Sequence, residues 1–183
     1  MNTMESIKYK GNWNEADFEQ MGWHDCKIYS ILSDDSNFRL ILDIDYIFEW
    51  ITDSESEYYK FLISPSTLVF HNVWDVKIDL ETDGEIEISD LHRENPQRAR
   101  NEAYIDKKME WDWLIETQSG TISFKSTGFD QYSRETPVLS ESQNLGLVSR
   151  MEMLKLYKIP GFNLTEPESK RVRPARPDEL PRQ

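Results

Sequence analysis

The strongest constraint in this sequence is a long alternation of apolar and polar residues between Phe38 and Trp50. Every even position in this stretch is apolar: Phe38, Leu40, Leu42, Ile44, Tyr46, Phe48 and Trp50. Charged residues occupy odd positions, namely Arg39, Asp43, Asp45 and Glu49. Because successive side chains of a β-strand point to opposite faces, this pattern predicts a strand with one face in the core and the other half-solvated.

Three further stretches have the composition of strands. Residues 24–32 carry apolar side chains at both parities. The stretch Tyr58–Ile63 is predicted to end at Ser64–Pro65, because proline has no amide hydrogen for a ladder. From Thr67 to Leu80 the alternation continues for longer than a usual strand, so we expect a bend or bulge within Asn72–Asp75, where polar residues cluster.

Turn-forming residues predict a first hairpin around Gly84. A three-residue loop of Thr82, Asp83 and Gly84 would set Leu80 opposite Ile86 and keep apolar residues on one face. Gly84 would then adopt the left-handed conformation of a β-bulge.

A second hairpin is predicted around Ser119-Gly120. A two-residue loop at this point would set Thr117 opposite Ile122 and Ile115 opposite Phe124. Trp111, Trp113 and Ile115 would then lie on one face of the sheet.

These elements predict a mainly β fold, an antiparallel curled sheet arranged as a sandwich or partly open barrel, with one or two short helices (α+β). Asn95–Pro96 is a pair typical of a helix start, and that helix would carry Ala99 and Ala103. Ser140 and Gln143 fit a capping box before residues 147–154, although the alternation of Met151 and Met153 also permits a strand there.

The chain is expected to divide into a single β-rich domain over residues 1–164 and a disordered or extended tail over residues 165–183. The tail is rich in proline and arginine and contains almost no apolar side chains. Such a composition buries too little apolar surface to offset the entropy of ordering.

Charge restricts the partners of this chain. The 183 residues carry a net charge of −13, which repels nucleic acid and anionic lipid and attracts basic protein surfaces. No apolar run is long enough to span a bilayer, and the start MNTMESIKYKGNW has no apolar export region. With a single cysteine, Cys26, we expect a cytoplasmic protein that binds neither nucleic acid nor membrane. No cofactor is predicted, because glycine-rich phosphate-binding motifs are absent from the sequence.

The stretch Gly22–Cys26 brings an imidazole, a carboxylate and a thiol together in the sequence. On a strand, His24 and Cys26 would share a face, as a Cys–His nucleophilic pair requires. A buried cysteine that behaves as a small apolar side chain is the simpler interpretation.

The three histidines, His24, His71 and His92, are candidates for a metal site if the fold brings them together. Additional oxygen ligands would come from Asp25, Asp75 or Asp79. His71 lies between Val69 and Val73, so a hydrogen-bonded structural histidine is the alternative.

Asp43 and Asp45 would lie about 6.6–7 Å apart along a strand, near the separation of an acid–base pair in a glycosidase. The polar face of a half-solvated strand explains this pair more simply.

Four short segments carry a family resemblance: Gly22-Trp23-His24-Asp25, Leu42-Asp43-Ile44-Asp45-Tyr46, Trp111-Asp112-Trp113 and Gly128-Phe129-Asp130-Gln131-Tyr132. Over residues 18–140 the chain resembles a group of small, largely uncharacterised bacterial proteins. It is also similar to the immunity proteins that accompany polymorphic toxins, several of which are compact β-rich domains. The resemblance implies a bacterial cytoplasmic protein that neutralises a toxin by binding it, and it implies no catalytic residue.

The leading hypothesis is therefore a noncatalytic protein-binding domain, of the immunity type, that captures a basic protein partner. The residues predicted to contribute to binding are Trp23, His24, Asp25, His71 and Asp75. The alternative is a small β-barrel enzyme or ligand carrier that uses His24, Asp25 and His71, with or without a metal. A third hypothesis is a homo-oligomeric scaffold that pairs edge strands.

Overall fold

The computed structural model describes residues 9–52, 58–146 and 150. In these residues the chain forms ten strands and one 3₁₀ helix, with the following bounds: β1 Asn12–Asn14, η1 Glu15–Gln20, β2 Lys27–Asp34, β3 Arg39–Thr52, β4 Tyr59–His71, β5 Trp74–Leu80, β6 Ile86–Arg98, β7 Met109–Thr117, β8 Gly120–Ser126, β9 Phe129–Ser133 and β10 Val138–Ser140. Within the described ranges, no helix has the length and apolar character needed to cross a membrane.

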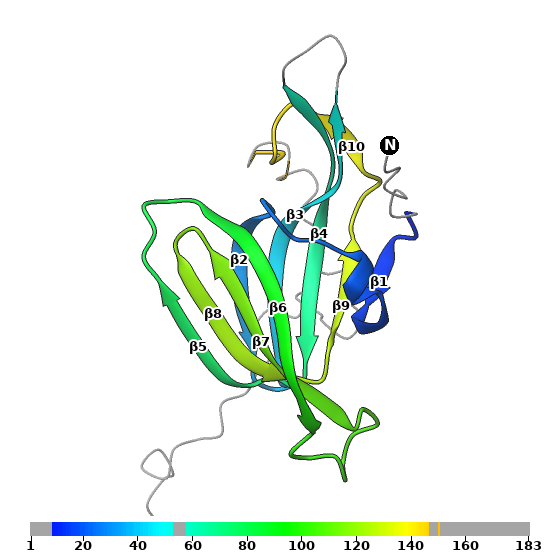
Figure 1. Ribbon diagram of the computed structural model, residues 1–183, viewed down its shortest axis with the longest axis vertical. Helices are drawn as coiled ribbons and strands as arrows, with labels where there is room; N and C mark the ends of the chain where they lie inside the picture. Colours follow the sequence, from blue (N-terminus) through cyan, green and yellow to red (C-terminus); the bar gives the residue numbers. More distant parts are fainter. Residues whose placement is uncertain (1–8, 53–57, 147–149, 151–183) are drawn as a thin grey trace, which may run out of the picture.

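The strands form one antiparallel sheet in the order β1-β9-β4-β3-β2-β6-β7-β8-β5, and β10 pairs with β4 beside β9. The sheet curls so that β5, β8, β7 and β6 face β2, β3 and β4 (Figure 1). It does not close, because β1 and β5 end the strand order. The predicted fold class, mainly β with an antiparallel curled sheet, is confirmed.

The core lies between the two halves of the curled sheet. Phe70 of β4 packs against Phe124 of β8 and Trp113 of β7, with ring centroids 4.6 and 5.1 Å apart. The predicted apolar face of β3 lies in this core, with Leu40, Leu42, Ile44, Tyr46 and Phe48 all buried. The alternation in the sequence therefore identifies the inner face of β3 correctly from Leu40 to Phe48. It is wrong at both ends: Phe38 precedes the strand, Trp50 follows a register shift between Ile47 and Glu49, and both are exposed.

The opposite face of β3 differs from the prediction. Asp43 and Asp45 are only 3% and 0% exposed, and Ile41 and Ile47 are also buried. A half-solvated strand was therefore the wrong prediction. Residues that follow β9 in the sequence cover this face and supply the countercharges described below.

Strand β4 continues through Ser64–Pro65, where the sequence predicted an end. Pro65 pairs with Asp45, and its carbonyl accepts a hydrogen bond from the Arg134 N–H at 2.9 Å. In an extended residue the nitrogen and the carbonyl point to the same side, so the nitrogen of Pro65 faces away from β3. On that side β9 pairs from Ser66 onward and β10 pairs only up to Ile63. Pro65 therefore lacks its N–H at a point between the two partner strands, and no hydrogen bond to β3 is lost.

The bend predicted within Asn72–Asp75 is confirmed. Strand β4 ends at His71 and β5 begins at Trp74. Asn72 and Asp75 both have positive φ angles, 51° and 52°. This bend takes the chain from the middle of one half of the sheet to the edge strand of the other half.

The two hairpin predictions had different outcomes. The chain does turn at Thr82, whose hydroxyl accepts from the Gly84 N–H at 3.1 Å. However, β5 and β6 do not pair, because β5 pairs with β8 instead and sets Leu80 opposite Gly120. The first hairpin was therefore wrong.

The β7–β8 hairpin exists with a register displaced by two residues from the predicted one. Thr117 lies opposite Gly120, and Ile115 opposite Ile122. The Thr117 hydroxyl holds the turn by accepting from the Ser119 N–H at 3.1 Å and donating to the Gly120 carbonyl at 2.9 Å. A shift of two residues preserves the face of every side chain, so Trp113 and Ile115 are buried as expected.

The helix predicted from Asn95–Pro96 does not form. Strand β6 runs through both residues, and its pairing with β7 is interrupted between Glu94 and Gln97. Asn95 has a positive φ of 51°, so the proline lies at an irregularity that tolerates a missing donor. The helix or strand predicted for residues 147–154 and the tail 165–183 lie outside the described residues, apart from Arg150.

Gly120 provides a test of this topology, because β5 passes directly over it. A Cβ added at Gly120 would lie 2.1 Å from the Asp79 carbonyl oxygen of β5. The φ angle of Gly120 is 133°, a conformation that residues with a Cβ rarely adopt. We expect Gly120→Ala to lower the free energy of unfolding by about 1–3 kcal/mol in urea titrations. Gly22→Ala is the matched control, since an added Cβ there meets nothing within 4 Å. Equal stability of the two variants would contradict the β5–β8 pairing.

Candidate functional site

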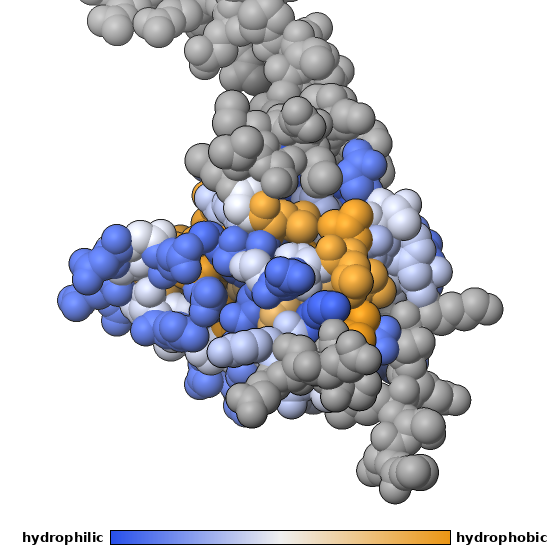
Figure 2. All heavy atoms as spheres, turned by 90° about the horizontal axis from the view of Figure 1, so that it is seen from above, coloured by the Kyte–Doolittle hydropathy of each residue, from blue (hydrophilic) through white to orange (hydrophobic). Residues whose placement is uncertain are grey.

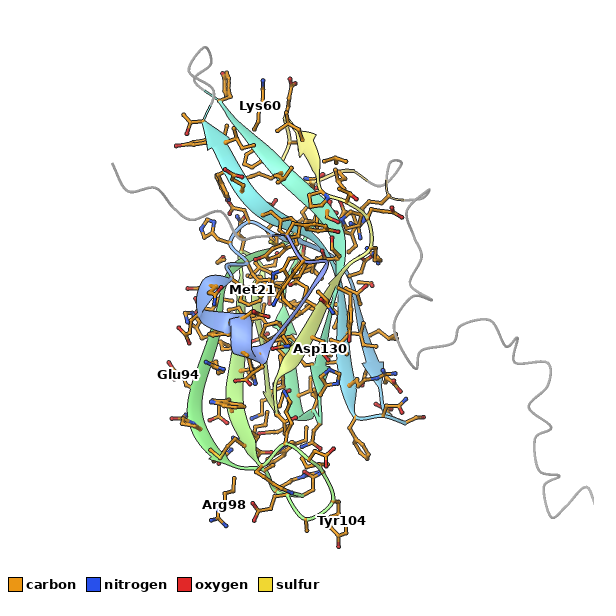
Figure 3. All side chains as sticks on the ribbon, turned by 90° about the vertical axis from the view of Figure 1, so that its right-hand side faces the viewer. Met21, Lys60, Glu94, Arg98, Tyr104 and Asp130 are labelled. Carbon is orange, nitrogen blue, oxygen red and sulfur yellow. The ribbon has the colours of Figure 1, made fainter. Side chains whose placement is uncertain are left out.

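The β3–β4 hairpin extends beyond the core and carries a group of exposed aromatic side chains. Lys60, labelled in Figure 3, marks this end of the molecule. Trp50 is 41% exposed, Tyr59 50% and Tyr58 81%. Burying large aromatic rings is favourable, so a cluster of them at the surface indicates a recognition site. We call Trp50, Tyr58 and Tyr59 the aromatic patch.

The aromatic patch borders a pocket of about 550 Å³. Its lining consists of Trp50, Tyr58, Tyr59, Lys60, Phe61, Glu141 and Gln143. Trp50 packs edge to face with Tyr59 and Phe61, with centroids 5.8 and 5.1 Å apart. This size, with several rings and a few polar groups, is typical of a binding site.

Apolar side chains continue beside the pocket on β10. Ser140 and Leu139 of β10 lie opposite Phe61 and Leu62 of β4. Val138 and Leu139 are 41% and 59% exposed. Figure 2, which looks down on this end of the molecule, shows apolar side chains gathered among hydrophilic ones.

Two of the predicted binding residues, His24 and Asp25, lie next to this pocket. The His24 ring is 6.3 Å from the Trp50 ring, and its Nδ1 lies 2.9 Å from Asp25 Oδ1. Asp25 Oδ2 accepts a hydrogen bond from the Gln143 side-chain amide at 2.9 Å. The residues Trp23–Asp25 form a turn before β2, held by the Asp25 N–H donating to the Ile88 carbonyl at 2.8 Å. This turn connects the predicted residues to the pocket wall.

A buried ionic cluster holds that wall against the outer face of β3. Arg134 pairs with Asp43, and Arg150 pairs with both Asp43 and Asp45. Tyr29 of β2 donates its hydroxyl to Asp45 at 3.0 Å, and the Arg150 guanidinium lies 3.8 Å from the centroid of the Tyr29 ring. We call these residues, Tyr29, Asp43, Asp45, Arg134 and Arg150, the ionic cluster.

The ionic cluster fixes the chain between Arg134 and Arg150 at both ends. The Leu145 N–H adds a third attachment by donating to Asp45 at 2.8 Å. Between these points lie Glu141 and Gln143, which line the pocket. The position of the pocket wall therefore depends on buried charges at some distance from the aromatic patch.

Burial sets the electrostatics of the ionic cluster. It lowers the pKa of the Arg134 guanidinium, an effect that the neighbouring Asp43 opposes. It also raises the pKa of Tyr29, with a further contribution from the charge of Asp45. Tyr29 therefore keeps its proton and remains a donor to Asp45. Because Arg150 bridges Asp43 and Asp45, these carboxylates have the surroundings of ion pairs and not of a solvated acid–base pair.

The structure places Trp23 and Cys26 in the core. Trp23 is 3% exposed and donates its indole N–H to the Gln131 side chain at 2.8 Å, so it supports the turn from behind and does not reach the surface. Cys26 is completely buried, and burial raises its pKa to about 12. His24 is exposed, so the two residues do not share a face and do not form the hypothesised nucleophilic pair.

His71 lies apart from His24, on β4. Its Nε2 is 2.8 Å from the Asp130 carboxylate of β9, and this hydrogen bond holds the pKa of Asp130 below its ordinary value. His92, on β6, lies 3.6 Å from Asp90 and 3.5 Å from Glu116. The described ranges contain no group of three or more His, Cys, Asp or Glu side chains that could hold a metal ion.

Asp75 is the second residue of the edge strand β5, away from the aromatic patch. Its carboxylate is 3.6 Å from the Lys77 ammonium, and both residues line a depression of about 220 Å³. Asp79 is exposed further along the same strand. The structure therefore brings His24 and Asp25 together at the pocket, while His71 and Asp75 lie on other strands.

Sequence reasoning missed the aromatic patch and the ionic cluster. Tyr58 and Tyr59 are consecutive, so in a strand they would point to opposite faces, a signal that at least one ring lies outside the core. Trp50 was assigned to the core because it continues the even positions of β3. No local pattern marks Arg134 or Arg150 as partners of Asp43, because these pairs form only in the folded chain.

A scan against protein-family models and searches of curated proteins and of solved structures found no match to this chain. The similarity to toxin-immunity proteins therefore remains a prediction, and the geometry of the site carries the functional argument.

The ionic cluster predicts a large effect of a small substitution. Asp43→Asn keeps the shape of the side chain but removes the charge shared by Arg134 and Arg150. We expect the free energy of unfolding to fall by about 3–5 kcal/mol, because two buried guanidinium groups lose a countercharge. Asp79→Asn, the same change on the exposed edge strand, should stay within about 0.5 kcal/mol of the parent protein in urea titrations. Similar values for the two variants would show that the cluster does not stabilise the fold.

The burial of Cys26 predicts an unreactive thiol. At pH 8, a pKa of about 12 leaves about one thiolate in ten thousand, and the sulfur is shielded from reagents. We expect iodoacetamide to leave the native protein unmodified over an hour and to alkylate Cys26 fully in 8 M urea, as measured by intact mass. Rapid alkylation of the native protein would restore the thiol as a candidate nucleophile.

Proposed function

We propose that this protein is a noncatalytic binding module that captures a protein partner with a basic surface through the aromatic patch. The observation that carries this proposal is the clustering of Trp50, Tyr58 and Tyr59 at the surface around one pocket. Trp and Tyr are the side chains most enriched among residues that dominate the energy of protein interfaces. An immunity-type inhibitor of a bacterial toxin is the most specific form of the proposal.

The charge of the chain supports a basic partner. The net charge is −13, and Glu141 is an exposed acid on the pocket wall. A field of this sign raises the association rate of a basic protein and lowers that of an acidic one. The aromatic patch would then supply most of the affinity after the encounter.

The pocket volume is the one observation that favours the alternative, a ligand carrier or small enzyme. The pocket is of a size that holds small molecules, and His24 and Asp25 lie beside it. His71, the third residue of that hypothesis, is bound to Asp130 on another part of the sheet. The alternative therefore reduces to a small ligand at the same pocket, without His71.

The test is capture of a partner from a lysate of the native host, followed by reconstitution with the purified partner. We expect the parent protein to bind the partner, and the double variant Tyr58→Ser/Tyr59→Ser to bind it at least about tenfold more weakly. Raising the salt concentration should lower kon markedly, because the encounter is between opposite charges.

Tyr104→Ser is the matched control. Tyr104 is 90% exposed and lies at the opposite end of the molecule from Lys60 (Figure 3). The Tyr104→Ser variant should bind the partner as tightly as the parent protein does. Equal binding by the patch variant, an association rate indifferent to salt, or recovery of no partner at all would count against the proposal.

A further inference from the structure

The pocket combines aromatic faces with oxygen acceptors. The Gln143 side-chain nitrogen donates a hydrogen bond to Asp25 at 2.9 Å. The side-chain carbonyl oxygen of Gln143 is therefore the group that can accept a hydrogen bond from a ligand. The exposed Glu141 carboxylate is a second acceptor on the same wall. Rings together with a carboxylate form the environment that attracts organic cations.

The chain repeatedly holds its own arginines in such an environment. The Arg93 guanidinium lies 4.5 Å from the Phe18 ring centroid and 5.1 Å from that of Trp111, and it pairs with Glu15 and Glu19. In the ionic cluster, Arg150 lies over Tyr29 and pairs with Asp43 and Asp45. In both places one guanidinium uses a ring face and carboxylate oxygens at once, which suits its planar shape.

We propose that the pocket beside the aromatic patch receives an arginine side chain of the basic partner. The guanidinium would stack on the rings of the aromatic patch and donate to Glu141 and to the Gln143 carbonyl. This inference rests on the proposed function and names the group that the partner inserts. Arginine fits better than lysine, because a planar guanidinium stacks on rings and offers five donors in a plane.

The charge of Lys60 allows a test of whether the ligand is a cation or an anion. It lines the same pocket, so its positive charge opposes a cationic ligand and would favour an anionic one. Lys60→Glu should therefore strengthen binding of an arginine side chain, and Glu141→Gln should weaken it. A carboxylate or phosphate ligand would show the opposite order.

The experiment is an NMR titration of the full chain with N-acetyl-arginine methylamide, followed at the indole N–H of Trp50. Trp50→Phe assigns that signal. We expect a dissociation constant on the order of 10 mM, typical of a single side chain without the rest of its protein. The matched probe is N-acetyl-citrulline methylamide, which has nearly the same shape without the charge. It should bind about fivefold more weakly or not detectably.

Glu81→Gln is the control for Glu141→Gln, because Glu81 is also exposed but lies on the connection between β5 and β6. It should leave the arginine affinity unchanged. N-acetyl-lysine methylamide, titrated in the same way, should bind more weakly than the arginine probe. Equal binding of the citrulline probe, tighter binding of the lysine probe, or insensitivity to both Lys60→Glu and Glu141→Gln would overturn the inference.

Failure of this inference and failure of the proposed function give different results. If the arginine probe does not bind but Tyr58→Ser/Tyr59→Ser still loses the protein partner, the patch binds protein without an arginine in the pocket. If the probe binds as expected and no protein partner depends on the patch, the pocket is a site for a small cationic ligand.

Discussion

The pairing of two arginines with two aspartates on the outer face of β3 is the interaction on which the rest of this structure depends. Asp43 and Asp45 occupy the middle of the sheet, where an unpaired charge would be very unfavourable. Arg134 and Arg150 neutralise them and so fold the chain after β9 back over the sheet. A hydrophobic cover would bind that face with less directional preference. Paired charges instead require particular residues in particular places, and Glu141 and Gln143 of the pocket wall lie between the two arginines in the sequence.

The aromatic patch lies where the regular pairing of β3 and β4 is interrupted near the hairpin end. β3 and β4 pair from Arg39–His71 to Thr52–Tyr59, and their hairpin end extends beyond the strands of the opposite half (Figure 1). The pairing of β3 with β4 shifts by one residue between Ile47 and Glu49, so Trp50 lies opposite Phe61, on the face of β4 that carries Ile63 and not Phe70. Trp50 therefore leaves the inner face and is 41% exposed, whereas Tyr46 is completely buried. Glu141 and Gln143, which follow β10, and the ring of His24 lie beside this end of the hairpin and border a pocket. A one-residue break in the alternation that builds the core thus places Trp50 at the recognition surface.

Much of the fold was predictable because it depends on local patterns, and the site was not because it depends on pairings between distant parts of the chain. The inner face of β3, the bend at Asn72–Asp75 and the β7–β8 hairpin all follow from periodicity and turn residues. The prediction of the first hairpin was wrong because β5 pairs with β8 and not with β6. The prediction that β4 ends at Pro65 was wrong because the proline nitrogen faces the gap between β9 and β10, where no hydrogen bond is lost. Of the predicted binding residues, His24 and Asp25 lie at the pocket because the turn that holds them contacts Gln143. Nothing local indicates the roles of Arg134 or Arg150.

The open sheet leaves β5 as an edge strand to which a second copy could add its own β5, and the charges of β5 restrict the register of such a pairing. The strand alternates Asp75, Lys77 and Asp79 with apolar residues, and its only partner in the described chain is β8. If two copies met edge to edge in the antiparallel register centred on Lys77, each Lys77 would face its own counterpart and each Asp75 would face an Asp79. Like charges directly opposite each other destabilise a ladder. In the registers centred on Val76 or Ile78, an aspartate would instead face Lys77, which is favourable. The charges of β5 therefore select among the possible edge pairings of two copies.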